Sequence, residues 1–204
     1  MAEFARRFRP EAETTILDVG GSLFNWALVD SPSQIAILNL TYAPGSHAGA
    51  ADNFTFLRGD GTRLPFCDQA FHIAYSNSVV EHLFTFEQQQ TFAAELSRIA
   101  DGLWIQTPAR PFPIEPHYLT PFIHFMPKSW QRRLLRNFTV WGWMTRPTQQ
   151  RVDATVEEIR LVTFKEMQVL FPDCEIEREK FLFLTKSYIA IRAPRGPQSP
   201  APTG

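Results

Sequence analysis

Four short stretches of polar residues and glycine each stand at or near the end of an apolar run, and their residue types suit the binding of a small polar ligand. They comprise, in chain order, Asp18, Gly20, Gly21 and Ser22, then Asn39 and Leu40, then Asp60, Gly61 and Thr62, and finally Ser76 and Asn77. If the apolar runs are parallel strands, their carboxyl ends lie at one edge of a sheet, where open α/β sheets bind ligands. We therefore expect these stretches to form one binding crevice.

The elements that must position this crevice are those of an α/β fold. Short apolar or β-branched runs alternate with longer stretches of helical spacing, which is typical of strands joined by crossover helices. Strands are expected at residues 14–19, 34–40, 53–57, 71–75 and 102–106. Between the last two, the apolar residues of segment 79–100 recur with helical spacing and predict a crossover helix broken near Thr85.

The last third of the chain has its own signals. Thr163 and Glu166 fit a capping box, which predicts a helix ending near residues 171–172. Segments 174–179 and 181–192 are strand-like with no helix between them, so we expect them to pair antiparallel. The proline-containing segment 193–204 is expected to be disordered, and residues 1–192 to form a single domain.

A proline-rich segment and an aromatic, arginine-containing segment together predict an insertion over about residues 108–150, with a polar connection at 146–153. Five prolines between 108 and 121 exclude regular helix and central strand, so an ordered loop or lid is expected. For residues 130–143 three interpretations stay open: packing on the domain itself, closure of an acceptor pocket, or peripheral membrane contact. In the third, arginines meet anionic lipid headgroups while apolar side chains enter the interface, namely Trp130, Leu134, Leu135, Phe138 and Trp141.

The composition excludes several classes of protein. Lys and Arg (20) nearly balance Asp and Glu (21), so the basic footprint of a nucleic-acid-binding protein is missing and no nucleic-acid partner is expected. Cys67 and Cys174 are not clustered with each other or with histidine, which indicates neither a disulfide framework nor a structural zinc site. With no signal-type or membrane-spanning run, a cytoplasmic protein is expected, with contact at the inner membrane face as a further option.

The order of these motifs along the chain and their residue sequences resemble those of a known family. Residues 16–22 read ILDVGGS, and residues 59–83 read GDGTRLPFCDQAFHIAYSNSVVEHL. The stretch from Ile16 to Gln106 resembles the core of class I S-adenosylmethionine-dependent methyltransferases, especially the group with a type 11 methyltransferase domain. The resemblance implies a three-layer, Rossmann-like sheet that is mostly parallel, with the antiparallel strand pair at its C-terminal end.

The same resemblance implies roles for the residues of the crevice, with S-adenosylmethionine as the cofactor. Asp18 and Gly20 would lie by the methionine portion, Asp60 would accept from the adenine amine, and Ser76 and Asn77 would flank the sulfonium. A dinucleotide is a poorer fit, because its pyrophosphate needs G-x-G-x-x-G and the corresponding positions after Gly20 are not glycine. An oxidoreductase that uses a nucleotide is kept as a weaker alternative.

Two features depart from the family pattern. The second strand commonly ends in Asp or Glu, which takes both ribose hydroxyls, whereas this chain has Asn39; Leu23 and Phe24 stand where richer glycine loops have small residues. Replacing a charge-assisted hydrogen bond by a neutral one loses roughly 1 kcal/mol, or five- to tenfold in affinity. A catalytically silent fold that acts as a binding or scaffolding module is therefore the alternative to an enzyme.

The reaction that the resemblance implies is methyl transfer to a small molecule or to a sugar- or lipid-linked acceptor. Its chief requirement is a near-attack geometry, and a base is optional. If the acceptor is a hydroxyl, His117 or His82 is the candidate to take its proton, because imidazole titrates near neutral pH. Further candidates for acceptor contact are Glu81, Tyr118 and His124. No spacing typical of metal ligands joins any two histidines, so no metal site is predicted.

Overall fold

The structure, a computed structural model, describes residues 1–194 apart from residues 30, 44 and 116. Its main element is a seven-stranded sheet with the strand order β3-β2-β1-β4-β5-β9-β8. The first five strands are parallel, and β9 and β8 are antiparallel, as the C-terminal pattern predicts. The strands are β1 (Thr15–Val19), β2 (Gln34–Asn39), β3 (Phe54–Arg58), β4 (Phe71–Asn77), β5 (Ala100–Pro108), β8 (Glu175–Phe181) and β9 (Leu184–Arg192).

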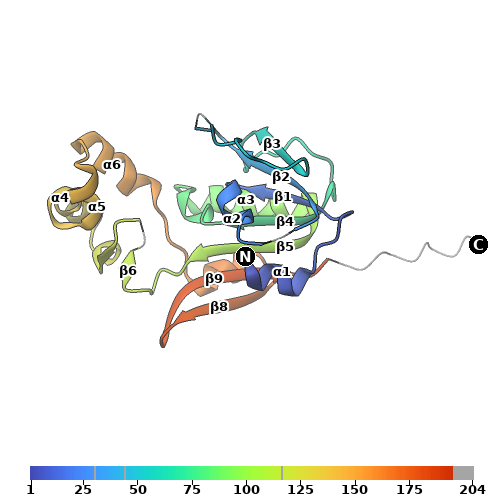
Figure 1. Ribbon diagram of the computed structural model, residues 1–204. Helices are drawn as coiled ribbons and strands as arrows, with labels where there is room; N and C mark the ends of the chain where they lie inside the picture. Colours follow the sequence, from blue (N-terminus) through green and yellow to red (C-terminus); the bar gives the residue numbers. More distant parts are fainter. Residues whose placement is uncertain (30, 44, 116, 195–204) are drawn as a thin grey trace, which may run out of the picture.

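Helices cover both faces of this sheet, so the predicted three-layer α/β fold is confirmed (Figure 1). One face packs against α3 (Phe86–Ile99) and α7 (Phe164–Leu170), and the other against α1 (Ala2–Phe8) and α2 (Leu23–Trp26). The predicted break near Thr85 is present, because η1 (Val80–His82), a single 3-10 turn, precedes α3. The Thr85 hydroxyl caps α3 by accepting from the Gln88 amide.

Helix α1 is an element that the sequence patterns did not indicate. Its Phe4 side chain is fully buried against the sheet, where it contacts the rings of Trp26, Tyr75 and Trp104 edge-on at 5.1–6.0 Å between centroids. A seven-residue helix shows too few turns for a periodic signal. Packing of Phe4 and Phe8 on the sheet and an ion pair from Arg7 to Glu177, rather than intrinsic helix propensity, therefore hold α1 in place.

The segment between β5 and α7, which contains the expected insertion, forms a lobe beside the sheet (Figure 1). It contains a two-stranded hairpin of β6 (Ile114–Glu115) and β7 (Thr120–Pro121), then η2 (Ile123–Phe125), α4 (Lys128–Phe138), α5 (Val140–Thr145) and α6 (Gln149–Glu158). The expectation of a polar connection over 146–153 is wrong from Gln149 onward, because Thr148 caps α6 by accepting from the Arg151 amide. The lobe has its own small core of Tyr118, Ile123, Leu135, Val152 and Val156.

The apolar residues of segment 130–143 divide between this small core and the surface. Leu135 is fully buried, and Leu134 and Trp141 pack against the lobe's core, so packing within the chain accounts for these three. Trp130 and Phe138 instead stay 59% and 70% exposed, and so does Trp143 at 73%. Among the described residues no helix combines the length and the apolar character needed to cross a bilayer.

The predicted start of the last helix is confirmed in detail. The Thr163 hydroxyl accepts from the Glu166 amide, and the Glu166 carboxylate accepts from the Thr163 amide, which completes the capping box. The strands β8 and β9 then form a hairpin in which Phe181 pairs with Leu184, so Phe181 belongs to the first strand rather than the second. Residues 195–204, for which disorder was predicted, lie outside the described residues.

Candidate functional site

Four turns at the carboxyl edge of the parallel strands converge, as the sequence predicts. In the register of the sheet, Val19 at the end of β1 pairs with Leu38 of β2 and with Ser76 of β4. Hydrogen bonds then tie the turns to one another: the Gly20 amide donates to the Leu38 carbonyl at 2.8 Å, and the Gly59 amide to the Asn39 carbonyl at 3.0 Å. The ends of β1, β2, β3 and β4 therefore meet at one place.

A crevice of about 230 Å³ opens between these turns. Five of the predicted cofactor residues line it: Gly20, Asn39, Leu40, Asp60 and Gly61. Apolar side chains form much of the remaining wall, and they include Val79, Leu83 and Phe92. The crevice thus combines exposed backbone, a few polar groups and an apolar surface, which is the usual make-up of a small-molecule site.

Two glycines are required for this shape. Gly20 has φ +78°, in the left-handed region, and a Cβ on it would stand 2.1 Å from Cγ2 of Val79. A Cβ on Gly61 would lie 2.7 Å from the ring of Phe92 and 2.9 Å from Cγ1 of Val19. The chain has glycine where any side chain would fill the crevice or displace its wall.

The other predicted cofactor residues do not line this crevice: Asn77 lines a second cavity, and the rest lie behind the turns or beside them. Ser76 is buried, and its hydroxyl donates to the Val19 carbonyl at 2.9 Å. Thr62 donates through both its amide and its hydroxyl to Oδ1 of Asp60, at 2.8 Å each, and so fixes that carboxylate. Gly21 is buried and accepts from the Asn39 side chain at 2.9 Å, and Ser22 is an exposed residue that precedes α2.

Asp18 lies beneath the glycine turn and is fully buried. Its Oδ2 accepts from Nε1 of Trp26 at 2.7 Å, and Oδ1 has no hydrogen-bond partner. Burial penalises the charged form and raises the pKa of Asp18 to about 7, although the bond from Trp26 opposes this shift. Asp18 therefore lies under the turn as a supporting residue, and the charge of its carboxyl group depends on pH near neutrality.

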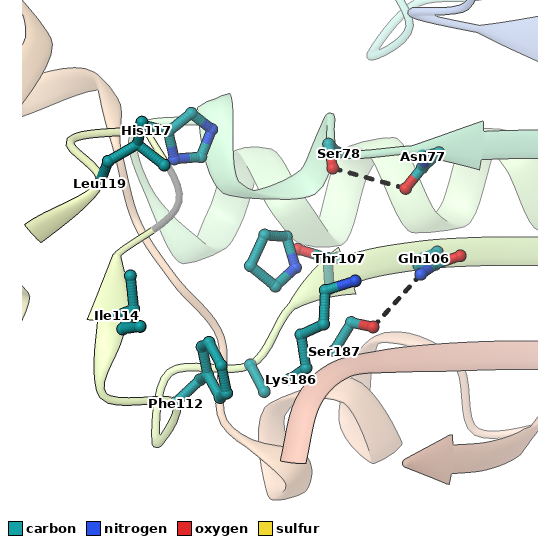
Figure 2. Close-up of a pocket in the computed structure, with 12 residues that line it drawn as sticks. Asn77, Ser78, Gln106, Thr107, Phe112, Ile114, His117, Leu119, Lys186 and Ser187 are labelled. Carbon is teal, nitrogen blue, oxygen red and sulfur yellow. Dashed lines mark hydrogen bonds between the residues drawn. The ribbon is translucent and has the colours of Figure 1, made fainter. Parts of the chain in front are cut away.

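A second and larger cavity, of about 390 Å³, adjoins the crevice. Figure 2 shows that its side chains come from the ends of β4, β5 and β9 on one side and from the lobe on the other. Its walls comprise Asn77, Ser78, Gln106, Thr107, Pro108, Ala109, Phe112, Ile114, His117, Leu119, Lys186 and Ser187. Because Asn77 and Ser78 line this cavity and Val79 lines the crevice, three consecutive residues separate the two spaces.

The two histidines predicted as proton acceptors meet at the edge of this cavity. The rings of His82 and His117 are 4.8 Å apart between centroids and perpendicular, and His117 is one of the residues that line the cavity. In each ring Nδ1 is bonded to a carboxylate: His117 to Glu115 at 2.6 Å, and His82 to Glu158 at 2.9 Å. Burial lowers the pKa of His117, but the bond to Glu115 and the charges of Glu115, Glu81 and Glu158 outweigh it and raise that pKa above its usual value.

Glu81, predicted to contact an acceptor, lies fully buried next to His117. Its Oε2 accepts from the Thr107 hydroxyl at 2.9 Å, whereas Oε1 has no hydrogen-bond partner. Desolvation by burial raises the pKa of Glu81. The sequence could not indicate this environment, because Thr107 and His117 are brought to Glu81 by β5 and by the lobe.

Tyr118 and His124 lie elsewhere. Tyr118 is buried in the core of the lobe, where its hydroxyl donates to the Thr155 carbonyl at 3.3 Å. Tyr118 and His124 both line a separate hollow of about 280 Å³. Nε2 of His124 is 3.0 Å from the Arg110 carbonyl oxygen. Burial lowers the pKa of His124. The structure thus groups these two residues together but apart from the cavity that His117 lines.

The residues that sequence reasoning missed come mainly from β5 and β9. Gln106 donates to Ser187 at 3.2 Å, which joins the two strands at the floor of the cavity (Figure 2). Lys186 places its amine at the same cavity. The predicted antiparallel pairing of the C-terminal strands was the one available signal, but it gave no register and so could not bring Lys186 to this edge.

Comparison with known proteins finds methyltransferases. Residues 20–102 match the family model described as a methyltransferase domain. An uncharacterized methyltransferase of Mycobacterium avium is 38% identical over 77 residues, which are 35% of this chain and 30% of that protein, so the match spans less than a third of the relative.

Solved structures share the fold. A S-adenosylmethionine-dependent methyltransferase of Methanosarcina mazei superposes with a TM-score of 0.54 at 14% identity, over 94% of this chain and 98% of that one. The 1,6-didemethyltoxoflavin-N1-methyltransferase of Burkholderia thailandensis, solved with S-adenosylhomocysteine bound, gives 0.57 at 12% identity, over 95% of this chain and 75% of that one.

Proposed function

We propose that this chain, whose residues 20–102 belong to the methyltransferase domain family, transfers the methyl group of S-adenosylmethionine to a small molecule or to a sugar- or lipid-linked acceptor. The observation that carries the proposal is the pair of adjoining spaces. A crevice built from the turns after β1, β2 and β3 meets a second cavity across residues 77–79. A methyl donor and an acceptor bound in these spaces would approach each other at the end of β4.

The crevice suits the cofactor because it offers close backbone approach without a phosphate cradle. Gly20 and Gly61 leave room for the methionine and adenosine portions, and Asp60 offers a fixed carboxylate to the adenine amine. S-adenosylmethionine carries no phosphate, so the incomplete G-x-G-x-x-G pattern is no obstacle. When bound, the cofactor supplies an activated methyl carbon.

The larger cavity suits an acceptor with an apolar body and a few polar atoms. Phe112, Ile114 and Leu119 of the lobe present apolar surface, while the opposite wall offers Asn77 and Lys186. Transfer is an in-line displacement in which the acceptor atom attacks the methyl carbon and the sulfur leaves with the bonding electrons. The chain's task is therefore to align donor and acceptor and to keep water out, which is what a lobe closing one side of the cavity provides.

Calorimetric titration of the full chain with S-adenosylmethionine and with S-adenosylhomocysteine tests the cofactor site. We expect binding at one site, and at least a tenfold loss of affinity in Gly20→Ala, because the new methyl group would meet Val79. Gly49→Ala is the matched control: Gly49 has φ +76°, nearly the same backbone, but nothing lies within 4 Å of its added Cβ. Absence of heat with both ligands would contradict the cofactor assignment.

A second measurement separates an enzyme from a silent binding module. The protein is incubated with cofactor labelled in its methyl group and with small-molecule and lipid fractions of a cell extract. Labelled product that disappears in Gly20→Ala but persists in Gly49→Ala supports methyl transfer. Cofactor binding without transfer to any fraction would favour the binding module.

A further inference from the structure

A cluster of potential metal ligands lies where the lobe meets the end of β4. Glu81 and His82 belong to η1, and His117 comes from the hairpin loop between β6 and β7. One ligand atom from each of these three residues lies within 4.8 Å of the other two. No local spacing joins His82 to His117, so the fold and not a sequence motif brings the three together.

Both histidines are oriented as metal ligands usually are. Because Glu115 lies at Nδ1 of His117 and Glu158 at Nδ1 of His82, each ring in its neutral form can keep its proton on Nδ1 and offer the lone pair of Nε2 to a metal ion. A carboxylate behind a histidine is the common outer-shell partner of metal-binding imidazole, where it fixes the tautomer and increases ligand basicity. Glu115 is itself positioned, because its other oxygen accepts from the Tyr118 amide at 2.7 Å.

The third ligand is a buried carboxylate oxygen with no hydrogen-bond partner. Oε1 of Glu81 is 3.8 Å from Nε2 of His117, which is too long for a hydrogen bond. The Glu81 side chain is fully buried, while Oε2 is occupied by Thr107. An unpaired carboxylate oxygen in such a place is costly unless a cation or donor satisfies it.

The charge of the cluster is also unbalanced. Glu81, Glu115 and Glu158 lie around two imidazoles, and the first two carboxylates are fully buried. Within the described residues no lysine or arginine forms an ion pair with any of the three. These three carboxylates around two imidazoles would attract a divalent ion to the ligands.

We propose that Glu81, His82 and His117 bind a divalent transition-metal ion at the wall of the larger cavity. Two imidazole nitrogens and one carboxylate oxygen form a donor set that zinc and other divalent first-row metals accept. At metal–ligand distances of about 2.0–2.1 Å, two ligand atoms lie at most ~4.2 Å apart, so the cluster would contract by about half an ångström. Three protein ligands leave a coordination position for water or for an atom of the acceptor.

The test uses the untagged, full-length protein after treatment with a chelator. Calorimetric titration with Zn²⁺ alone should show one strong site per chain. Affinity should fall at least 100-fold in Glu81→Gln and His117→Gln, which remove a ligand, and about tenfold or more in Glu158→Gln, which removes an outer-shell partner. His72→Gln is the matched control, because His72 lies on the sheet and bonds to Thr15 instead of to the cluster.

A spectroscopic titration with Co²⁺ guards against misfolded variants and against binding by thiols. The wild-type chain should develop visible absorption bands of a site with nitrogen and oxygen ligands, without the thiolate charge-transfer band that Cys67 would give. Half-exposed Glu158 gives the variant best expected to fold, so weaker Co²⁺ binding there supports the proposal even if Glu81→Gln unfolds. The proposal would be overturned if the wild type bound no stoichiometric Co²⁺ or gave a thiolate spectrum. It would also be overturned if the folded variants Glu158→Gln and His117→Gln bound Co²⁺ as tightly as the wild type.

Discussion

Asn39 meets one structural requirement of the crevice, the anchoring of its glycine turn. The family pattern commonly has Asp or Glu at the end of the second strand, as an acceptor for the ribose hydroxyls. Here Nδ2 of Asn39 donates to the Gly21 carbonyl at 2.9 Å, and a carboxylate, which has no proton to donate, would face that carbonyl oxygen unfavourably. The amide therefore anchors the glycine turn, and under the proposed function it would offer the ribose a neutral acceptor in place of a charged one.

Asp18, beneath the same turn, makes the stability of the protein depend on pH. Its pKa in the folded state, about 7, is higher than the ordinary 3.8, so the folded state keeps a proton that the unfolded chain has lost between these values. The contribution of Asp18 to the free energy of unfolding is thus fully present below pH 4 and is lost as the pH rises through 7. We expect Asp18→Asn to remove this fall, which is of the order of a few kcal/mol.

Urea unfolding at several pH values between 4 and 8 measures this effect. The free energy of unfolding is plotted against pH, and the slope of this plot is compared between variant and wild type. Contributions from other groups cancel in this comparison, because these groups titrate equally in both proteins. Asp52→Asn, at an exposed position, is the matched control and should leave the slope unchanged. The same slope in Asp18→Asn and in the wild type would show that Asp18 stays ionised in the folded state.

At the scale of the element, the fully buried ring of Phe4 is the main anchor of the short helix α1. Phe4→Ala should lower the free energy of unfolding by about 3–5 kcal/mol, because it leaves a cavity between α1 and the rings of Trp26 and Trp104. Phe24→Ala removes the same group from a position that is 75% exposed and should change stability by less than ~0.5 kcal/mol. Equal effects in urea unfolding would mean that α1 does not pack as described.

Helices α4 and α5 keep the prediction of membrane contact open on part of the expected residues, Trp130 and Phe138, with Trp143 added. Trp130, Phe138 and Trp143 are exposed near the exposed arginines Arg133 and Arg136, which together resemble an interfacial surface. We predict that the protein cosediments with vesicles containing phosphatidylserine and less with neutral vesicles. Phe138→Ser combined with Trp143→Ser should reduce this binding several-fold.

Phe183→Ser provides the control for that experiment. Phe183 is 96% exposed but lies in the turn between β8 and β9, away from α4 and α5 (Figure 1). Its replacement should leave vesicle binding unchanged. Binding that does not depend on anionic lipid, or that Phe183→Ser reduces equally, would contradict contact through α4 and α5.

For the molecule as a whole, the parallel sheet and the crevice could be predicted because their signals are local. Each strand is an apolar run, each turn carries its own glycine or polar residue, and parallel pairing brings all the turns to one edge. The cluster around His117 could not be predicted, because its contacts join distant segments: His82 and Glu158 are 76 positions apart. Such pairs depend on how the lobe folds. The helix α6, which carries Glu158, was not predicted, and its first residues were expected to be a polar connection.

The same cluster joins the lobe to the sheet, which gives a prediction about the whole molecule. A metal ion bound by η1 and by His117 would have to be released before the lobe could separate, so the ion should stabilise the closed arrangement. At a free Zn²⁺ concentration 100 times the dissociation constant the gain is about 2.7 kcal/mol. Proteolytic cleavage that requires the lobe to open should then slow by about 100-fold, provided that opening and closing are fast relative to cleavage.

Limited proteolysis with Zn²⁺ and with chelator tests this prediction, and mass spectrometry identifies the cleavage sites within residues 109–162. His117→Gln should show no protection by Zn²⁺, whereas protection equal to the wild type would mean that the ion acts elsewhere on the chain.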